Sequence, residues 1–247
     1  LNGADDDASG VSAVLELAEA FSCRALRPRR SMLFALFSGE ERGLRGSEHY
    51  VDHPAVAMDR TIAMLNFDMV GRGTVGQFTV NGAGTSAGFA ELLGEAARAS
   101  GCDSTIRIVA SGLVPSDSSN FYRKRVPLLS FNTGLHEDYH KPTDDVEKIV
   151  PAQIETVARV GFHVLSALAD TDPARPPFSD EDFVPGLPPY REWPFLGIKG
   201  PEDDEPGVEV GGLHPTGAGA RAGLVPGDIV LSLDGRAVRT TDDFLPI

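Results

Sequence analysis

Short apolar runs and helical patterns alternate through residues 1–170 of this chain, and this alternation constrains its fold more than any other feature. Ser9 to Ala25 repeats apolar residues at helical spacing. Ser31 to Ser38 is almost continuously apolar, as in a strand that is buried on both faces. Strands that alternate with helices usually form a parallel sheet covered by helices. The sequence therefore predicts an α/β domain with a mostly parallel central sheet and flanking helices.

The elements expected further along the chain keep to this alternation. A second helix is expected within Gly39 to Val51. Beyond it, the apolar patterns predict strands at 61–71, 77–82, 104–110 and 125–134, and helices at 87–100 and 150–170. The helix at 87–100 is expected to end at Gly101, because glycine readily takes the left-handed conformation that closes a helix.

The composition changes after Asp170 and predicts a second domain. Residues 171–193 are rich in proline and acidic residues, which is typical of a linker. Residues 194–247 combine short apolar runs with glycine-containing turns, which predicts a small, mostly β domain. The expected organisation is an α/β domain over 1–170, a linker over 171–193 and a β domain over 194–247.

The net charge narrows the class of partners. Acidic residues number 36 against 22 basic residues, which gives a formal charge of -14. A protein that binds the phosphate backbone of DNA or RNA needs a basic face, so no nucleic-acid partner is expected.

No apolar stretch is long enough to cross a bilayer. Because the chain starts with Leu1 and stops at Ile247 within a domain-like pattern, we expect it to be truncated at both ends.

Acidic side chains and a histidine fall at several predicted strand ends and helix starts. Asp5–Asp7 precede the first helix, Glu40 and Glu41 follow an expected strand, Asp68 ends another, and His140 follows the last. Ligands of open α/β sheets bind beyond the carboxyl ends of the strands. We therefore expect these side chains to converge on one edge of one sheet.

Each of these residues also has an ordinary structural interpretation. An aspartate before a helix usually caps it, a glutamate pair is usually a solvated helix start, and an aspartate after a strand often forms a turn. A single loop histidine is more often hydrogen-bonded than a ligand. Carboxylates packed together repel one another, however, and a divalent cation removes that repulsion. Carboxylate and imidazole ligands together suit zinc, which promotes attack by water on acyl bonds.

Four segments in this order resemble successive motifs of the zinc aminopeptidases of metallopeptidase family 28. They are "NGADDDASGVSAVLELA", "FALFSGEERGLRGSEHYV", "MLNFDMVGR" and "TGLHEDYHKPTDD". The resemblance covers roughly residues 1–170. It implies a zinc-dependent enzyme that removes N-terminal residues from peptides with a free N-terminus. Relatives of this kind are secreted, periplasmic or attached to membranes, and the same location is expected here.

The resemblance also implies a ligand set for two zinc ions. Asp6 matches the bridging ligand, Glu41 and His140 match the ligands of one zinc, and Asp68 matches a ligand of the other. The family's remaining ligand is a histidine upstream of the aspartate cluster. It would precede Leu1 and is therefore not part of this chain.

Two further residues match positions that take part in the reaction. Glu40 matches the general base that accepts a proton from the attacking water, and Tyr139 resembles a tyrosine that polarises the substrate carbonyl. The peptide bond after the bridging aspartate is often cis in the family, so a cis bond is expected between Asp6 and Asp7. Asp5 and Asp7 are expected to orient this loop or to cap the helix that follows.

The C-terminal segment resembles PDZ domains. The segment "AGARAGLVPGDIVLSLDGRAV" is similar to their core, and "FLGI" is similar to the loop whose amides bind a peptide C-terminus. The residues of this loop are Phe195, Leu196, Gly197 and Ile198. The alternative is a β module that only packs on the first domain.

Two other functions remain open at this point. Glutaminyl cyclases share this fold and use a single zinc held by Asp, Glu and His, which matches Asp6, Glu41 and His140. A protein without catalytic activity that binds peptides through its PDZ-like domain is the second alternative. The retention of Glu40, Glu41, Asp68 and His140 argues against the latter.

Overall fold

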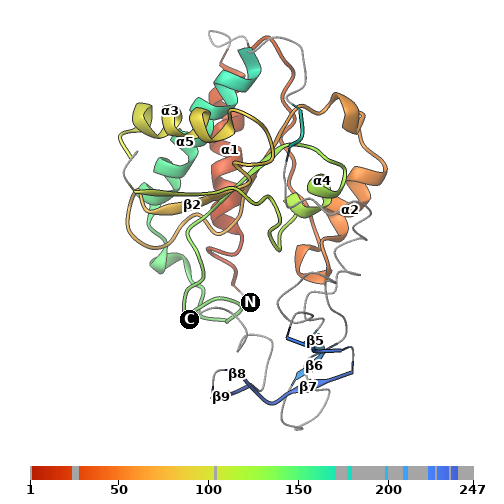
Figure 1. Ribbon diagram of the computed structural model, residues 1–247. Helices are drawn as coiled ribbons and strands as arrows, with labels where there is room; N and C mark the ends of the chain where they lie inside the picture. The colour runs from red at the N-terminus through yellow and green to blue at the C-terminus, as the bar shows by residue number, and fades with distance from the viewer. Residues whose placement is uncertain are drawn as a thin grey trace. The chain divides into compact units, whose positions relative to one another are not determined.

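The computed structural model describes residues 2–23, 28–102, 105–170, 177–179, 198–199, 208–210, 222–225, 227–233 and 235–238. The chain divides into two compact units, Leu1–Gly186 and Leu187–Ile247 (Figure 1). This division falls within the predicted linker, of which only 177–179 are described. The exact domain boundaries stay a prediction.

A sheet of four strands forms the centre of the first unit. Its strands are β1 (Met64–Phe67), β2 (Phe78–Asn81), β3 (Ile106–Val109) and β4 (Leu128–Asn132), in the order β1-β4-β2-β3. β1 pairs with β4 and β2 pairs with β3 in parallel, whereas β2 and β4 are antiparallel. The predicted α/β class with a mostly parallel sheet is therefore confirmed.

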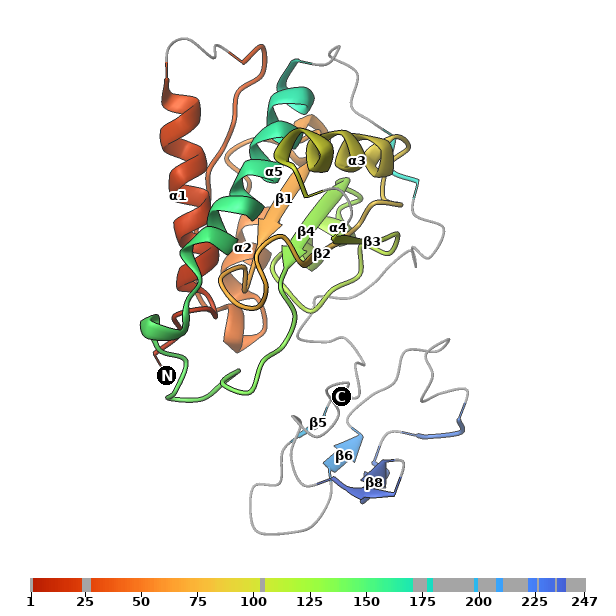
Figure 2. The ribbon, with the colours of Figure 1, turned by 90° about the vertical axis from the view of Figure 1, so that its left-hand side faces the viewer.

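Helices flank this sheet. They are α1 (Ala8–Ser22), α2 (Arg45–Asp52), α3 (Phe89–Ser100), α4 (Ser118–Arg123) and α5 (Pro151–Asp170), with short 3-10 turns η1 (Glu40–Arg42), η2 (Met58–Arg60) and η3 (Val146–Lys148). α5 packs against α1 and α3 (Figure 2), and α2 packs against α4 (Figure 1). The main core joins α1 and α5 to the sheet, where Phe67 of β1 stacks on Phe131 of β4 with ring centroids 4.9 Å apart. No described helix is both long and apolar enough to span a membrane.

The prediction of a strand at Ser31 to Ser38 is wrong. Residues 31–37 pair with no strand among the described residues, and the side chains of Leu33 and Leu36 are 57% and 55% exposed. An apolar run becomes a buried strand only where a neighbouring strand bonds to its backbone and other layers cover its side chains. Neither condition is met in the described part of the chain, so the segment forms no strand.

The helix α4 was not expected from the sequence. Its serines and asparagine are more typical of a turn, yet Ser118, Ser119 and Asn120 are all fully buried. Asn120 Nδ2 donates to the carbonyl oxygen of Leu44 at 3.1 Å and to Ser47 Oγ at 2.9 Å. Tertiary hydrogen bonds of this kind offset the low helix propensity of the segment.

The start of α1 lies so close to β1 that Gly10 has no room for a side chain. A Cβ at this position would lie 2.2 Å from the carbonyl oxygen of Phe67 and 2.4 Å from Asp7 Oδ1. The Gly10→Ala variant must therefore shift backbone, and we expect it to lower the free energy of unfolding by about 1–3 kcal/mol in denaturant titrations. Gly94→Ala on α3 is the matched control, because its Cβ would meet only Arg98 Nη1 at 3.5 Å. Equal stability of the two variants would contradict the prediction.

The described residues of the second unit form strands and turns and no helix. β5 (Ile198–Lys199), β6 (Val208–Val210) and β7 (Ile229–Val230) form an antiparallel sheet, and β8 (Ser232–Leu233) pairs with β9 (Arg236–Ala237). This agrees with the predicted small β domain. Of the expected peptide-binding loop, Ile198 lies in β5, whereas Phe195, Leu196 and Gly197 lie outside the described residues.

Candidate metal centre and active site

The parallel pairing of β1 and β4 brings two chain segments to the same edge of the sheet. Asp68 directly follows β1, and its amide donates to the carbonyl oxygen of Phe131 at 3.2 Å. Thr133 directly follows β4, and its amide donates to the carbonyl oxygen of Met69 at 2.8 Å. The loop after Thr133 carries His140. The predicted convergence at the carboxyl ends of these strands is therefore found.

Three predicted metal ligands meet at this edge. The ligand atoms of Asp6, Glu41 and His140 all lie within 4.8 Å of one another. His140 Nε2 is 3.1 Å from Glu41 Oε2 and 3.5 Å from Asp6 Oδ2. One imidazole nitrogen and two carboxylates fit a zinc ion and leave further coordination positions for water or substrate. The cluster is partly open to solvent, because the His140 side chain is 33% exposed.

Asp68 and Glu40 interact electrostatically with this cluster. Asp68 Oδ2 accepts a hydrogen bond from Ser116 Oγ at 2.6 Å, and Ser116 Oγ accepts one from Asn66 Nδ2 at 2.8 Å. Burial raises the pKa of Asp68, while the Ser116 bond lowers it and the charge of Glu41 raises it further. Asp68 is thus held in a fixed orientation beside the three ligands.

The acidic groups raise one another's pKa values. Burial raises the pKa of Asp6 to about 7, with further contributions from the charges of Glu41 and Asp68. Burial raises the pKa of Glu40 to about 8, with Asp68 and Asp117 adding to the shift. Such a group of carboxylates is costly to ionise together unless a cation is present. This electrostatic arrangement supports the fit of a divalent metal ion.

Tyr139 lies beside the cluster. Its ring stacks on that of His140 with centroids 3.8 Å apart. Burial raises the pKa of Tyr139 well above its usual range, and the charge of Asp6 adds to this shift. The phenol therefore stays protonated and can donate a hydrogen bond. Its role in the reaction stays a prediction, as do the roles of the ligands.

The loop that presents Asp6 has the predicted features. The Asp6–Asp7 peptide bond is cis. Asp7 caps α1, because its Oδ1 accepts hydrogen bonds from the amides of Gly10 at 3.0 Å and Met69 at 3.2 Å. Asp5 is fully buried, and its Oδ1 accepts a hydrogen bond from the Gly71 amide at 2.6 Å. Asp5 and Asp7 thus orient the loop from both sides of Asp6.

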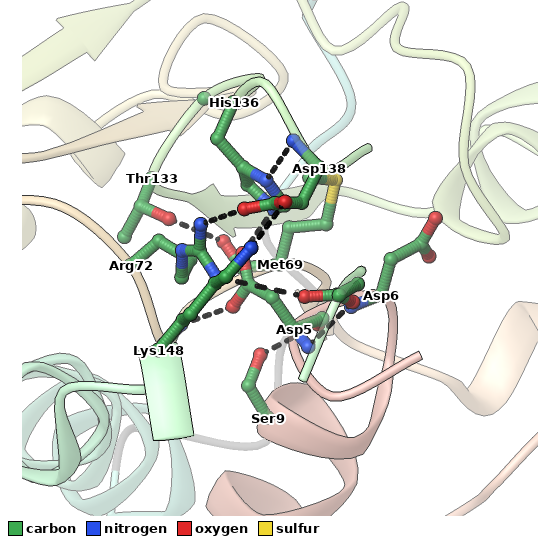
Figure 3. Close-up of polar contacts among 12 residues, drawn as sticks. Asp5, Asp6, Ser9, Met69, Arg72, Thr133, His136, Asp138 and Lys148 are labelled. Atoms are coloured by element: carbon green, nitrogen blue, oxygen red, sulfur yellow. Dashed lines mark hydrogen bonds and ion pairs between the residues drawn. The ribbon is translucent and has the colours of Figure 1, made fainter. Parts of the chain in front are cut away.

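Several residues around the cluster were not predicted from the sequence. They are Asn66, Arg72, Ser116, Asp138, Asp144 and Lys148, and Figure 3 shows the network that includes Arg72, Asp138 and Lys148. Asp138 and Asp144 belong to the His140 motif, but their spacing does not reveal which residues they contact. Asn66 lies in β1, two residues before Asp68, which directly follows this strand, and this period-two spacing was the one available indication.

Asp117 should make stability depend on pH. Its carboxylate accepts a hydrogen bond from Ser47, and burial raises its pKa from 3.8 to about 6. The folded state holds the proton of Asp117 more tightly than the unfolded state does. The stabilisation that this proton provides is therefore present below pH 3.8 and is lost as the pH rises through about 6. In chelator at neutral pH, Asp117→Asn is expected to raise the free energy of unfolding by roughly 1–3 kcal/mol relative to the parent.

Denaturant titrations across this pH range test the Asp117 prediction. The gain should disappear below the unfolded pKa of 3.8, where the parent aspartate is protonated in both states. The control is Asp59→Asn, which changes an exposed aspartate in η2. A difference between Asp117→Asn and the parent that does not vary with pH would exclude this explanation.

Comparison with known proteins identifies the family of this chain. The sequence profile of peptidase family M28 matches residues 1–165, and that of PDZ domains matches residues 209–247. The chain therefore belongs to peptidase family M28 and carries a PDZ domain at its C-terminal end. Aminopeptidase YwaD of Bacillus subtilis is 30% identical over 166 residues, which make up 62% of this chain and 35% of that protein.

Solved structures agree with the family assignment. BSAP, a zinc aminopeptidase from Bacillus subtilis, superposes with a TM-score of 0.61 at 26% identity, covering 72% of this chain and 46% of that one. Porphyromonas gingivalis glutaminyl cyclase gives a TM-score of 0.53 at 20% identity, covering 67% and 63%, and this likeness concerns the fold alone. The chain spans less than half the length of these two Bacillus subtilis aminopeptidases.

Proposed function

We propose that this chain is the catalytic part of a zinc-dependent aminopeptidase that releases N-terminal residues from peptides. The observation that carries the proposal is the meeting of Asp6, Glu41 and His140 ligand atoms within 4.8 Å. The half-buried Glu40 interacts electrostatically with Asp6 and Glu41, whose charges help to raise its pKa. The M28 family assignment and the zinc aminopeptidase among the solved structures support the same function.

In this proposal each residue has a defined task. Asp6, Glu41 and His140 would hold a zinc ion, which would polarise the scissile carbonyl and make water a better nucleophile. Glu40 accepts a proton from the attacking water and delivers it to the nitrogen of the leaving amine as the carbon–nitrogen bond breaks. Tyr139 donates a hydrogen bond to the carbonyl oxygen. The carboxylates of Glu40 and Asp68 attract the positively charged N-terminus of the substrate.

A second zinc is the finer part of the proposal. It would share Asp6 and take Asp68, whose orientation the Ser116 hydrogen bond fixes. From the family resemblance, its remaining ligand is proposed to be a histidine upstream of the aspartate cluster. Metal analysis of the full-length protein tests this part separately, because two zinc ions per chain are expected and one would contradict it.

The PDZ domain is proposed to bind peptide C-termini through Phe195–Ile198. A secreted, periplasmic or membrane-attached location is proposed from the family resemblance.

Glutaminyl cyclase activity is the second candidate, because the Asp6, Glu41 and His140 set alone would satisfy a single zinc. The full-length protein, loaded with zinc, should be assayed for hydrolysis of aminoacyl-nitroanilides and for cyclisation of peptides with N-terminal glutamine. Hydrolysis without cyclisation is expected. Cyclisation without hydrolysis would replace the proposal with a glutaminyl cyclase. If the protein showed neither activity but bound peptides, the PDZ domain would be its functional part.

A further inference from the structure

Asp144 forms several contacts to the loop that presents Asp6. The residue is buried, at 2% exposure. Its Oδ2 accepts hydrogen bonds from the amide of Asp5 at 2.8 Å and from the amide of Asp6 at 3.1 Å, and its own carbonyl oxygen accepts one from the Ala4 amide at 3.1 Å. A buried carboxylate that accepts backbone amides forms strong, charge-assisted hydrogen bonds. One residue therefore fixes the backbone on the N-terminal side of a candidate ligand.

Asp144 also belongs to the loop that presents the second candidate ligand. It follows His140 by four residues. Neither Asp6 nor His140 lies in a helix or strand, so no ladder of backbone hydrogen bonds sets their separation. The bonds from Asp144 to Asp5 and Asp6 link the two loops directly. The position of Asp6 relative to His140 thus depends on this carboxylate.

Arg72 fixes the His140 loop on both sides. Its Nη1 lies 3.7 Å from Asp144 Oδ1, and its Nη2 donates to Asp138 Oδ2 at 2.6 Å. Lys148 Nζ donates to the other oxygen of Asp138 at 2.5 Å, as Figure 3 shows. Asp138 and Asp144 flank His140, so the ion pairs restrict the loop before and after the ligand. Asp144 is the member of this network that touches the Asp6 loop through two hydrogen bonds.

His136 adds a parallel link. The Asp138 amide donates to His136 Nδ1 at 3.2 Å, so in the neutral ring the proton resides on Nε2. That Nε2 lies 3.2 Å from Asp5 Oδ2. This contact, which is not a hydrogen bond, brings the same two loops together at Asp5 and not at Asp6. Because this link does not include the Asp6 amide, it does not replace Asp144.

We propose that Asp144 is a positioning residue that holds Asp6 and His140 at the separation required to bind one metal ion. The inference rests on the proposed function of the cluster as a zinc site. Preorganisation of this kind lowers the cost of ordering two loops around a cation, so its loss appears first in metal affinity. A residue that served stability alone would change the unfolding transition without changing the relative affinity for zinc.

The test measures the zinc dissociation constant of the full-length protein by competition with a chromophoric chelator. Asp144→Ala removes both acceptor bonds and is expected to weaken zinc binding about 10–100-fold. Asp144→Asn keeps an oxygen that can accept both amides but loses the charge. Its loss is expected to be roughly tenfold, at the lower end of that range. The matched control is Asp145→Ala, which removes a neighbouring carboxylate that is bonded to Asn2 and not to Asp5 or Asp6.

Two further readouts separate positioning from folding. Denaturant unfolding of the metal-free variants shows whether each is folded. If Asp144→Ala does not fold, the zinc affinity of Asp144→Asn decides whether the inference holds. The absorption bands of the cobalt-substituted protein should shift in the Asp144 variants and not in Asp145→Ala, because they report ligand geometry. Folded Asp144 variants that bind zinc within about twofold of the parent, or an equal loss in Asp145→Ala, would overturn the inference. A parent protein that binds no zinc would instead overturn the proposed function.

Discussion

Replacing Glu40 by glutamine is expected to lower kcat for aminopeptidase activity by about 10²–10⁴-fold, the usual contribution of a general base. The amide has nearly the shape of the carboxylate but cannot accept the proton of the attacking water. Glu40 is not one of the three residues whose ligand atoms converge in the described chain. Zinc content should therefore stay at the parent value while turnover is lost.

The measurement combines metal analysis with steady-state kinetics on an aminoacyl-nitroanilide. Glu16→Gln is the control, because it makes the same chemical change on the exposed side of α1. Full activity in the Glu40 variant would exclude it as the base. Loss of zinc together with activity would assign Glu40 a structural or ligand role instead.

Replacing His140 by alanine is expected to abolish tight zinc binding and, with it, activity. His140 supplies the one nitrogen donor of the described cluster, and its Nε2 lies close to both carboxylate partners. Substitutions of residues behind metal ligands cost about 10–100-fold in affinity, so the loss of a direct ligand should exceed about 100-fold. Without the imidazole, Asp6 and Glu41 would also face each other with no intervening donor.

Chelator competition measures this loss, and activity at saturating zinc shows whether added metal restores function. The control is His49→Ala, which removes an exposed histidine on α2 whose ring stacks on His53. If His140→Ala kept the parent affinity, the zinc would have to lie elsewhere. If His49→Ala lost affinity to the same extent, the effect would not be specific to the cluster.

The two variants probe different parts of the same proposal. Glu40→Gln should separate catalysis from metal binding, whereas His140→Ala should remove both. Asp144→Ala is expected to weaken zinc binding more than Glu40→Gln and less than His140→Ala. It leaves every ligand in place and changes only how the loops are held. This order of effects distinguishes base, ligand and positioning residue in a single series.

Local patterns were sufficient for most of the fold. The helix at the start of the chain, the strand before Asp68 and the end of α3 at Gly101 all follow from periodicity or from glycine chemistry, because these features depend on neighbouring residues. The run from Ser31 to Ser38 was misinterpreted as a strand, since strand formation depends on a partner that lies elsewhere in the chain. α4 was missed for the related reason that tertiary hydrogen bonds stabilise it.

The donors of the candidate site could be chosen without any structure. The resemblance of four segments to zinc aminopeptidases selected them, and they are Asp6, Glu40, Glu41, Asp68 and His140. Residue type alone suggested only that carboxylates and a histidine suit zinc, because each of these residues also has an ordinary structural interpretation.

The residues that hold these donors became visible only in the folded chain. They are Arg72, Asp144 and Ser116, and each contacts a segment far away in the sequence. Ser116 is 48 residues from Asp68, and Asp144 is 138 residues from Asp6. Hydrogen bonds between such distant loops depend on how the parallel strands β1 and β4 bring the loops together, and no local pattern contains that pairing.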